Sequence, residues 1–327
     1  MTPPALFSRR QVLAATGAAA LAAAATPIHA QGDTPLRLYV GFPPGGSGDL
    51  FARILADGMR EELNRPVVVE NKPGAGGMTV AIGFQRAPRD GNHLMLATGS
   101  TAVAAPVSRA RPPYSPIDDF QWLALLSNAP FVIAVNPTLP VNNLKELVEY
   151  AKARPGKLSY GHAGLGTTVH LAGELLKDRA GIQVLDVPYA GSGPAITDTI
   201  AGNVHYIIET TGTLAPHAKS GRLRIISCMA EAREKIAPDV QTCREAGYDV
   251  VSGTYNLLAV PSGTPQDAAD RLARAATRTM DKPAVQDKLA ALGITPVLGS
   301  TPAQAKAFMT AEVAKWSAVC RKLGIAL

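Results

Sequence analysis

The sequence predicts an α/β protein of two domains, each a mostly parallel sheet flanked by helices. Short apolar runs bounded by Gly, Pro or Asn alternate with helix-like segments along the chain. Nine such runs would make an unusually wide single sheet, so two sheets are expected. Bends rich in glycine or hydroxyl groups follow several runs, at the strand exits where open α/β sheets bind ligands.

Residues 1–30 have the character of a signal peptide of the twin-arginine type. Ser8-Arg9-Arg10 precedes a long alanine-rich stretch, and Ala30 offers a small residue for cleavage. The general secretory route stays open. A membrane anchor is the competing interpretation, but alanine is weakly apolar and a polar, proline-bearing segment follows. We therefore expect an exported, soluble, periplasmic protein.

The expected strands are short, often β-branched and buried. They are 36–42, 67–70, 93–98, 131–136, 158–160, 183–187, 204–209, 223–229 and 257–260. The expected helices carry apolar residues on one face and end near Gly or Pro. They are 50–63, 79–86, 143–154, 168–179, 266–280, 284–292 and 302–323.

The chain is expected to cross between the two domains near Leu125–Pro130 and again near Ser252–Asn256. The first domain would then hold residues 31–128 and 255–327, and the second would be the insert 129–254. The ligand cleft would lie between them.

The stretch Gly41–Asp49 is the most informative bend. It links an apolar run to a helix, so several backbone N–H groups and the positive helix end would face one point and could bind an anion. Similar bends follow four later strands, and together they suit a small carboxylate. The expected ligand-binding residues are Phe42, Pro44, Gly45, Gly46, Ser47, Asp49, Gly99, Ser100, Thr101, Gly166, Thr167, Thr168, Tyr189, Ala190, Gly191, Ser192 and Glu209.

Two acidic residues in these bends have alternative roles. Asp49 could accept an amine from a ligand, or simply favour the dipole in the first turn of its helix. Glu209 ends a strand in a neutral bend. It would repel a carboxylate and suit an amino group, or it is an exposed acid at a strand end. Ser and Thr at helix starts also have the ordinary role of N-caps.

Composition excludes several other classes of function. Removing Arg9 and Arg10 lowers the formal charge from +6 to +4, and the basic residues are scattered, so nucleic-acid binding is not expected. The cysteines Cys228, Cys243 and Cys320 form no CxxC pair, which argues against a zinc or redox site. Two of them could pair in an exported chain, or all three are small apolar fillers.

No catalytic pattern stands out, and we expect neither an enzyme nor a cofactor. The chain lacks Gly-x-Ser-x-Gly, Ser-x-x-Lys, His-Glu-x-x-His and phosphate-loop motifs. The spacing of His162 and His170 does not fit one helical face and no carboxylate or cysteine completes the set, so no metal is expected. A periplasmic hydrolase or isomerase that acts on a small acid, such as a hydrolase that uses Ser100 with His170, stays an alternative.

The chain resembles the Bug-type receptors of tripartite tricarboxylate transporters over nearly its whole mature length. The motifs that carry the resemblance occur in order: Gly41–Asp49 with Ala52-Arg53, Val69–Gly77, Tyr160–Leu171, Val187–Ser192, Ala201–Val204, Gly221–Arg224, Pro238–Thr242, Glu245–Gly247 and Pro261–Pro265. Such an ordered run is far more specific than any single motif.

The resemblance implies a two-domain periplasmic receptor of the venus-flytrap kind, type II-like, that holds a ligand carboxylate at the first glycine bend. The ligand would be a di- or tricarboxylate, an amino acid or an aromatic acid. The implied partner is a membrane permease with large and small subunits, or alternatively a sensor kinase, and we expect a monomer. One departure concerns ligand charge, because Ala190 stands where the family usually has lysine.

Overall fold

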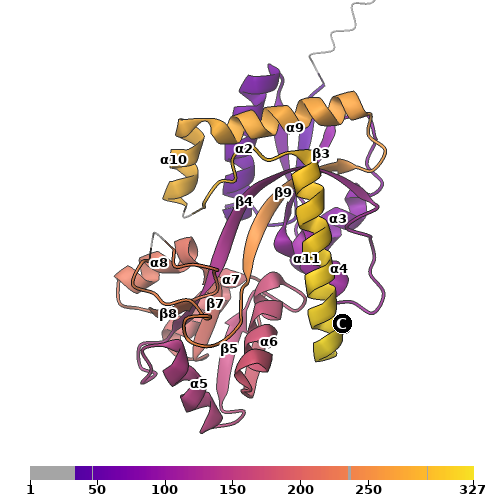
Figure 1. The fold of residues 1–327 in the computed structure, drawn as a ribbon. Coiled ribbons are helices and arrows are strands. Elements are labelled where there is room, and N and C mark those ends of the chain that lie inside the picture. The colour runs from indigo at the N-terminus through magenta and orange to yellow at the C-terminus, as the bar shows by residue number, and fades with distance from the viewer. Residues whose placement is uncertain (1–33, 46, 235–236, 293) are drawn as a thin grey trace, which may run out of the picture. The chain divides into compact units, whose positions relative to one another are not determined.

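The computed structural model describes residues 34–327, apart from residues 46, 235–236 and 293. The signal peptide expected at residues 1–30 therefore lies outside the described residues. The chain from Pro35 to Leu327 forms one compact unit of strands and helices (Figure 1).

The first sheet has the order β2-β1-β3-β9-β4. Its strands are β1 (Leu36–Val40), β2 (Val67–Asn71), β3 (His93–Thr98), β9 (Gly253–Pro261) and the long β4 (Phe120–Val135). β1 pairs in parallel with β2 and β3, whereas β9 is antiparallel to both of its neighbours. Four of the five strands therefore point the same way, as the alternation of strands and helices predicted.

The second sheet has the order β6-β5-β7-β4, and β8 pairs with the other edge of β4. The added strands are β5 (Leu158–His162), β6 (Val184–Pro188), β7 (Tyr206–Thr210) and β8 (Arg224–Cys228). β5 is parallel to β6 and β7, and β4 is antiparallel to β7 and β8. Here again one strand runs against the rest.

β4 belongs to both sheets, which joins them through continuous hydrogen bonding. Its first part pairs with β9 as far as Pro130 opposite Gly253, and from Phe131 onward it pairs with β7. A methyl group added to Gly253 would lie 2.6 Å from the Ala129 carbonyl oxygen, so only glycine allows this close approach. Residues 125–130 and 253–256, in the two segments where a crossing between domains was expected, are extended strand in β4 and β9.

Helices cover both faces of the first sheet. α2 (Ser47–Leu63) packs on β1 and β2 and against α9 (Gln266–Asp281), and α10 (Pro283–Ala291) lies beside them. One core cluster joins Leu38, Phe51 and Leu272 on this face. The opposite face packs against α3 (Met78–Phe84) and α11 (Pro302–Leu323).

The second sheet is also covered on both faces. α5 (Leu144–Lys152) and α6 (Thr168–Ala180) contribute to the large core cluster on one face. α7 (Ser192–Ala201) and α8 (Thr211–Lys219) contribute Ile196 and Leu214 to a separate cluster on the other face. The central strand β7 is correspondingly buried at Tyr206–Ile208, whereas the edge strand β6 exposes Leu185.

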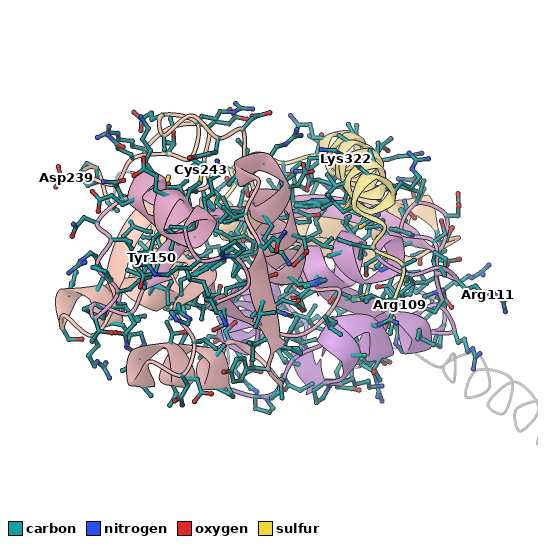
Figure 2. The ribbon with its side chains drawn as sticks, turned by 90° about the horizontal axis from the view of Figure 1, so that it is seen from below. Arg109, Arg111, Tyr150, Asp239, Cys243 and Lys322 are labelled. Atoms are coloured by element: carbon teal, nitrogen blue, oxygen red, sulfur yellow. The ribbon has the colours of Figure 1, made fainter. Side chains whose placement is uncertain are left out.

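α11 spans contacts with both sheets. It packs on β4, on α6 and on the helical turns that follow β3, namely η2 (Ser100–Ala104) and α4 (Ala105–Val107). Its start has a capping box formed by Thr301 and Gln304. Lys322, labelled in Figure 2, is near its end. Its Nζ lies 2.5 Å from Asp178 Oδ2 of α6.

The three cysteines are buried and none forms a disulfide. Cys243 donates its backbone N–H to the Cys228 carbonyl, and burial raises the pKa of its thiol to about 12. This arrangement matches the interpretation of small apolar fillers. None of the helices that the structure describes combines the length and apolar character of a bilayer crossing.

Candidate functional site

The Gly41–Asp49 bend connects β1 to α2, as the sequence predicted. Asp49 is buried, and its two carboxylate oxygens accept hydrogen bonds from three directions. Gly45 N–H donates to Oδ2 at 2.9 Å, Arg53 Nε to Oδ2 at 2.9 Å, and Asn71 Nδ2 to Oδ1 at 2.9 Å. The hydrogen bonds from Arg53, followed by those from Gly45 and Asn71, lower the pKa of Asp49 from 3.8 to about 2 despite its burial.

Asp49 therefore stabilises the shape of the bend through these hydrogen bonds. The same Asn71 amide that reaches Asp49 also donates to the Phe42 carbonyl at 3.0 Å, so β2 holds both ends of the bend. Phe42 is half-buried, and Pro44 and Gly45 are exposed, with Gly45 at φ +82°. Gly46 and the side chain of Ser47 lie outside what the structure describes.

We expect Asp49→Asn to lower the free energy of unfolding by about 2 kcal/mol at neutral pH, because charged hydrogen bonds are replaced by weaker or mismatched ones. A carboxylate with a lowered pKa stabilises the fold above its unfolded pKa, and this stability is lost as pH falls toward the folded value. The difference between wild type and variant should therefore shrink between pH 3.8 and about 2.

Urea unfolding at several pH values measures this difference. Asp57→Asn is the matched control, since Asp57 is on the same helix, exposed, and 3.4 Å from Arg60. We expect it to change stability by less than about 0.5 kcal/mol. A pH-independent effect of Asp49→Asn would contradict the assigned hydrogen bonds.

Three bends of the first sheet lie against one another. A methyl group added to Gly41 would lie 2.7 Å from Gly77 Cα, and one added to Gly77 would lie 2.0 Å from Thr101 Oγ1. Gly77 ends the short turn η1 (Ala75–Gly77) with φ +90°. The glycines of this segment thus turn the chain before α3 and also allow close contact with the neighbouring bends.

A bend of the second sheet contacts this group directly. The backbone N–H of Thr168 donates to Ser100 Oγ at 3.2 Å, and the Thr168 and Ser100 hydroxyls are also 3.2 Å apart. A methyl group on Gly99 would lie 3.0 Å from Thr168 Cγ2, and one on Gly76 would lie 3.4 Å from Thr167 Cγ2. Hydroxyls and glycines of Gly99–Thr101 in the first sheet and of Gly166–Thr168 in the second therefore meet.

The hydroxyl of Thr101 has no partner within this contact. Thr101 is 1% exposed, and its Oγ1 finds no hydrogen-bond partner among the described residues. A buried hydroxyl without a partner is unfavourable unless a water or a ligand supplies the bond. This feature depends on the packing of distant segments, so no sequence signal could have identified it.

The remaining predicted residues form a neighbouring group on the second sheet. Tyr189 donates its hydroxyl to Asp198 Oδ2 at 2.7 Å, and its carbonyl lies 3.4 Å from a methyl group built on Gly164. Ala190 is exposed, and Gly191 at φ +138° precedes α7. Ser192 Oγ donates to Glu209 Oε2, and removal from water raises the pKa of Glu209.

Glu209 is thus a half-buried acceptor next to the start of α7. Its Oε1 accepts the Thr210 N–H at 2.8 Å, and Ser192 occupies the other oxygen. The two roles considered for Glu209 predict different burial. An exposed acid at a strand end would be open to solvent, whereas a ligand contact would be partly buried. Partial burial together with two hydrogen bonds gives the carboxylate a fixed position.

One cluster of side chains, formed by His162, His170 and Asp186, was not predicted from the sequence. The pairing of β5 with β6 brings Asp186 beside His162, with His162 Nε2 and Asp186 Oδ2 3.6 Å apart. The His170 ring lies beside that of His162, tilted by 37°. The statement that no carboxylate joins the two histidines is therefore wrong. The cause is that Asp186 is distant in sequence and arrives through strand register.

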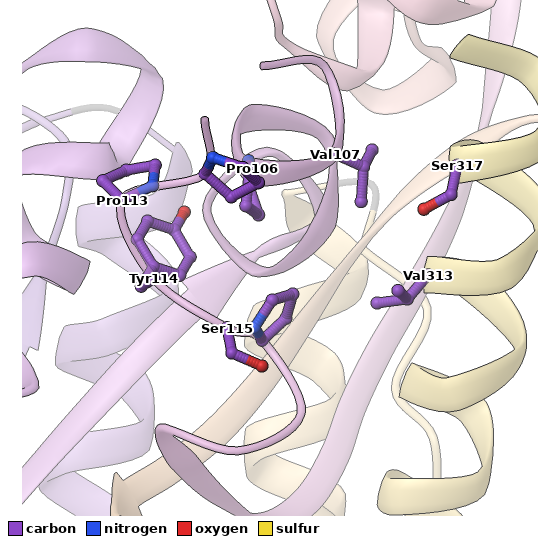
Figure 3. Close-up of a pocket in the computed structure, with 9 residues that line it drawn as sticks. Pro106, Val107, Pro113, Tyr114, Ser115, Val313 and Ser317 are labelled. Atoms are coloured by element: carbon purple, nitrogen blue, oxygen red, sulfur yellow. The ribbon is translucent and has the colours of Figure 1, made fainter. Parts of the chain in front are cut away.

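Two cavities of the described residues lie elsewhere. One of ≈ 420 Å³ is lined by prolines and Tyr114 before β4 and by Val313 and Ser317 of α11 (Figure 3). The other, of ≈ 280 Å³, lies between α9 and the start of α11. Neither of these two cavities is lined by a predicted ligand-binding residue.

The chain matches known proteins over most of its length. Residues 51–325 match the family described as the tripartite tricarboxylate transporter family receptor. Protein BugT of Bordetella pertussis is 34% identical over 314 residues, which cover 94% of this chain and 95% of BugT.

Solved structures are similar as well. The R. palustris protein Rpa4515, solved with adipate, is 28% identical with a TM-score of 0.83 and covers 90% of this chain and 98% of its own. MatC (Rpa3494) from Rhodopseudomonas palustris, solved with bound malate, is 28% identical with a TM-score of 0.81 and covers 88% and 99%. Both the sequence motifs and the fold lead to one conclusion: the chain belongs to the tripartite tricarboxylate transporter receptor family, whose members are solute-binding proteins.

Proposed function

We propose that this protein is a periplasmic receptor that captures a small carboxylate for a tripartite tricarboxylate-type transporter. The observation that carries the proposal is the contact between Ser100 of the first sheet and Thr168 of the second, at 3.2 Å. Hydrogen-bond donors from both sheets meet there. Two similar proteins were solved with adipate and with malate, which supports a di- or tricarboxylate over other small acids.

The binding chemistry relies on neutral donors. The proposed contact residues include no lysine or arginine, so the ligand's charge would be met by backbone N–H groups, by hydroxyls such as Thr101 Oγ1, and by helix starts. Such donors bind a carboxylate without changing it chemically, which agrees with a receptor and offers no activated nucleophile for catalysis.

Closure is proposed to occur about the crossings in β4 and β9. Domain 1 would hold residues 31–128 and 255–327 and domain 2 residues 129–254, with the ligand cleft between them. The Pro130–Gly253 pair lies at this boundary and removes one ladder hydrogen-bond donor. A ligand that contacts both domains would stabilise the closed form, which a membrane permease would then recognise.

Isothermal titration calorimetry with malate, adipate, citrate, aspartate and benzoate tests the proposal on the purified mature chain. We expect saturable binding of at least one acid with one site per chain. Proton NMR of the same mixtures should show the acid unchanged. Failure of every acid to bind, or its conversion to a product, would overturn the proposal.

We expect Ser100→Ala to weaken binding of the cognate acid by about tenfold. The variant loses the hydroxyl that accepts the Thr168 N–H, and this hydrogen bond forms only when the domains meet. One such hydrogen bond contributes about 1 kcal/mol or slightly more. Ser220→Ala is the control, because this exposed serine bonds only to its own helix and to Arg222. Equal affinities for both variants would show that the contact plays no part in capture.

A further inference from the structure

Two buried histidines lie directly beneath the Gly164–Thr168 bend. His162 ends β5 and His170 is in the first turn of α6, and their ring centroids are 4.8 Å apart. The His162 side chain is fully buried, and His170 is 5% exposed. Buried histidines need hydrogen-bond partners, and here the partners reveal the protonation state of each ring.

Both rings accept a hydrogen bond from the bend. Gly164 N–H donates to His162 Nδ1 at 3.2 Å, and Gly166 N–H donates to His170 Nδ1 at 3.3 Å. A backbone N–H can only donate, so each Nδ1 must carry a lone pair. Each imidazole is therefore neutral with its proton on Nε2. His162 Nε2 lies 3.6 Å from Asp186 Oδ2, too far for a hydrogen bond, and has no hydrogen-bond partner among the described residues.

A metal site is the obvious alternative for this cluster. Ligand atoms of His162, His170 and Asp186 lie within 4.8 Å of one another. A histidine that binds a metal through Nε2, however, normally donates its Nδ1 proton to a carbonyl or carboxylate. In both rings Nδ1 instead receives a proton donor, which requires the opposite tautomer. The geometry therefore favours two neutral rings without a metal.

The bend held by these rings is the one that reaches the first sheet. The Gly164 carbonyl accepts the Thr167 hydroxyl at 2.6 Å, and the Thr167 hydroxyl in turn caps the His170 N–H. The next residue, Thr168, donates to Ser100. Gly164 and Gly166 have φ of +121° and +72°, so the bend has a shape that other residues rarely adopt. The two imidazoles help to hold it in that shape.

We propose that His162 and His170 are positioning residues that hold the Gly164–Thr168 bend only while both rings are neutral, which makes ligand capture sensitive to acid. This inference rests on the proposed function. A proton added to Nδ1 converts an acceptor into a donor that faces the Gly164 or Gly166 N–H. Two donors cannot bond, so the bend must rearrange and Thr168 loses its position opposite Ser100.

The groups around the two rings shift the histidine pKa values in opposite directions. Burial lowers the pKa of both histidines, that of His170 from 6.5 to about 4, and the neighbouring ring lowers the His170 value further. Glu174 and Asp186 raise both values, and Lys177, which pairs with Glu174 at 2.8 Å, lowers that of His170. The aromatic neighbours Tyr160 and Tyr206 stay neutral in this range because burial raises the pKa of each.

The first test needs no ligand. Nitrogen NMR of the imidazoles in the wild-type protein at neutral pH should show both Nδ1 atoms unprotonated, and the Gly164 and Gly166 amide signals should shift as the rings titrate below pH 6.5. Protonated Nδ1 atoms at neutral pH would overturn the inference. Loss of the Nε2 protons on adding one equivalent of Zn²⁺ would also overturn it, in favour of a metal site.

The second test compares binding of malate or adipate, whichever binds, as pH is lowered. Asparagine places an acceptor near the position of Nδ1 but does not titrate. Wild-type affinity should halve when His170 is half protonated, near pH 4, and fall about tenfold one unit lower. In His162→Asn/His170→Asn the affinity, whatever its value at neutral pH, should change less with pH.

His217→Asn, on α8, is the control and should follow the wild-type pH profile, which includes any titration of the acid itself. Identical profiles for the double variant and the wild type would overturn the inference. If no acid binds at any pH, the proposed function fails, while the NMR result still decides whether the neutral rings hold the bend.

Discussion

Gly173→Ala is expected to lower the free energy of unfolding by about 2–3 kcal/mol. Gly173 is inside α6, and a methyl group there would lie 2.3–2.4 Å from two ring carbons and the hydroxyl oxygen of Tyr160. That ring cannot move aside easily, because it is fully buried, stacks on Tyr206 and donates its hydroxyl to the His170 carbonyl and to Glu174. Overpacking of this kind outweighs the gain in helix propensity, which is about 1 kcal/mol.

Urea unfolding followed by circular dichroism measures this loss as a lower midpoint with an unchanged slope. Gly83→Ala is the matched control. Gly83 is also helical and exposed, and a methyl group there meets nothing within 4 Å. The same substitution should leave stability unchanged or raise it by up to about 1 kcal/mol. A Gly173→Ala variant as stable as wild type would mean that Tyr160 has more room than the packing shows.

Gly41→Ala is expected to weaken binding of the cognate carboxylate by at least about tenfold and to destabilise the fold by about 1–3 kcal/mol. The added methyl group would lie 2.7 Å from Gly77 Cα and 2.9 Å from Val80 Cγ1. The first of these is a backbone atom, so a change of rotamer cannot relieve the contact. The first bend and the Gly74–Gly77 bend must separate, and Gly77 would then lose its contact with Thr101.

Calorimetric titration and urea unfolding of the same variant separate the two effects. Gly48→Ala is the control from the same bend, because its methyl group would meet the Phe42 ring at an ordinary 3.5 Å. We expect that variant to keep its stability. Wild-type affinity in Gly41→Ala would show that the packing of these two bends does not shape the binding site.

Most helices and strands could be predicted from local pattern. The helix expected at 302–323 begins and ends at those residues, and the strand at 93–98 does as well. The first part of β4 was missed because Ser127–Pro130 has the composition of a turn. Pairing with β9 along Phe120–Pro130 overrides that local preference, and the proline is tolerated where β4 changes partners.

The candidate site, like the fold, was predictable only in part. The bends were predictable because glycines and hydroxyl residues directly follow apolar runs. The roles of individual residues within them were not. Asp49 has both oxygens occupied by Gly45, Arg53 and Asn71, and Asn71 comes from a different strand. Which atoms surround a carboxylate depends on strand order, which local pattern does not contain.

The sequence by itself determined the alternation of strands and helices, the position of the glycine bends and the family, because these depend on residue types at short spacing. Only the tertiary structure decided that Ser100 contacts Thr168, that the buried hydroxyl of Thr101 has no partner among the described residues, and that Asp186 faces His162. Contacts between residues far apart in the chain follow from the register and packing of strands, and that packing is set by the whole core at once.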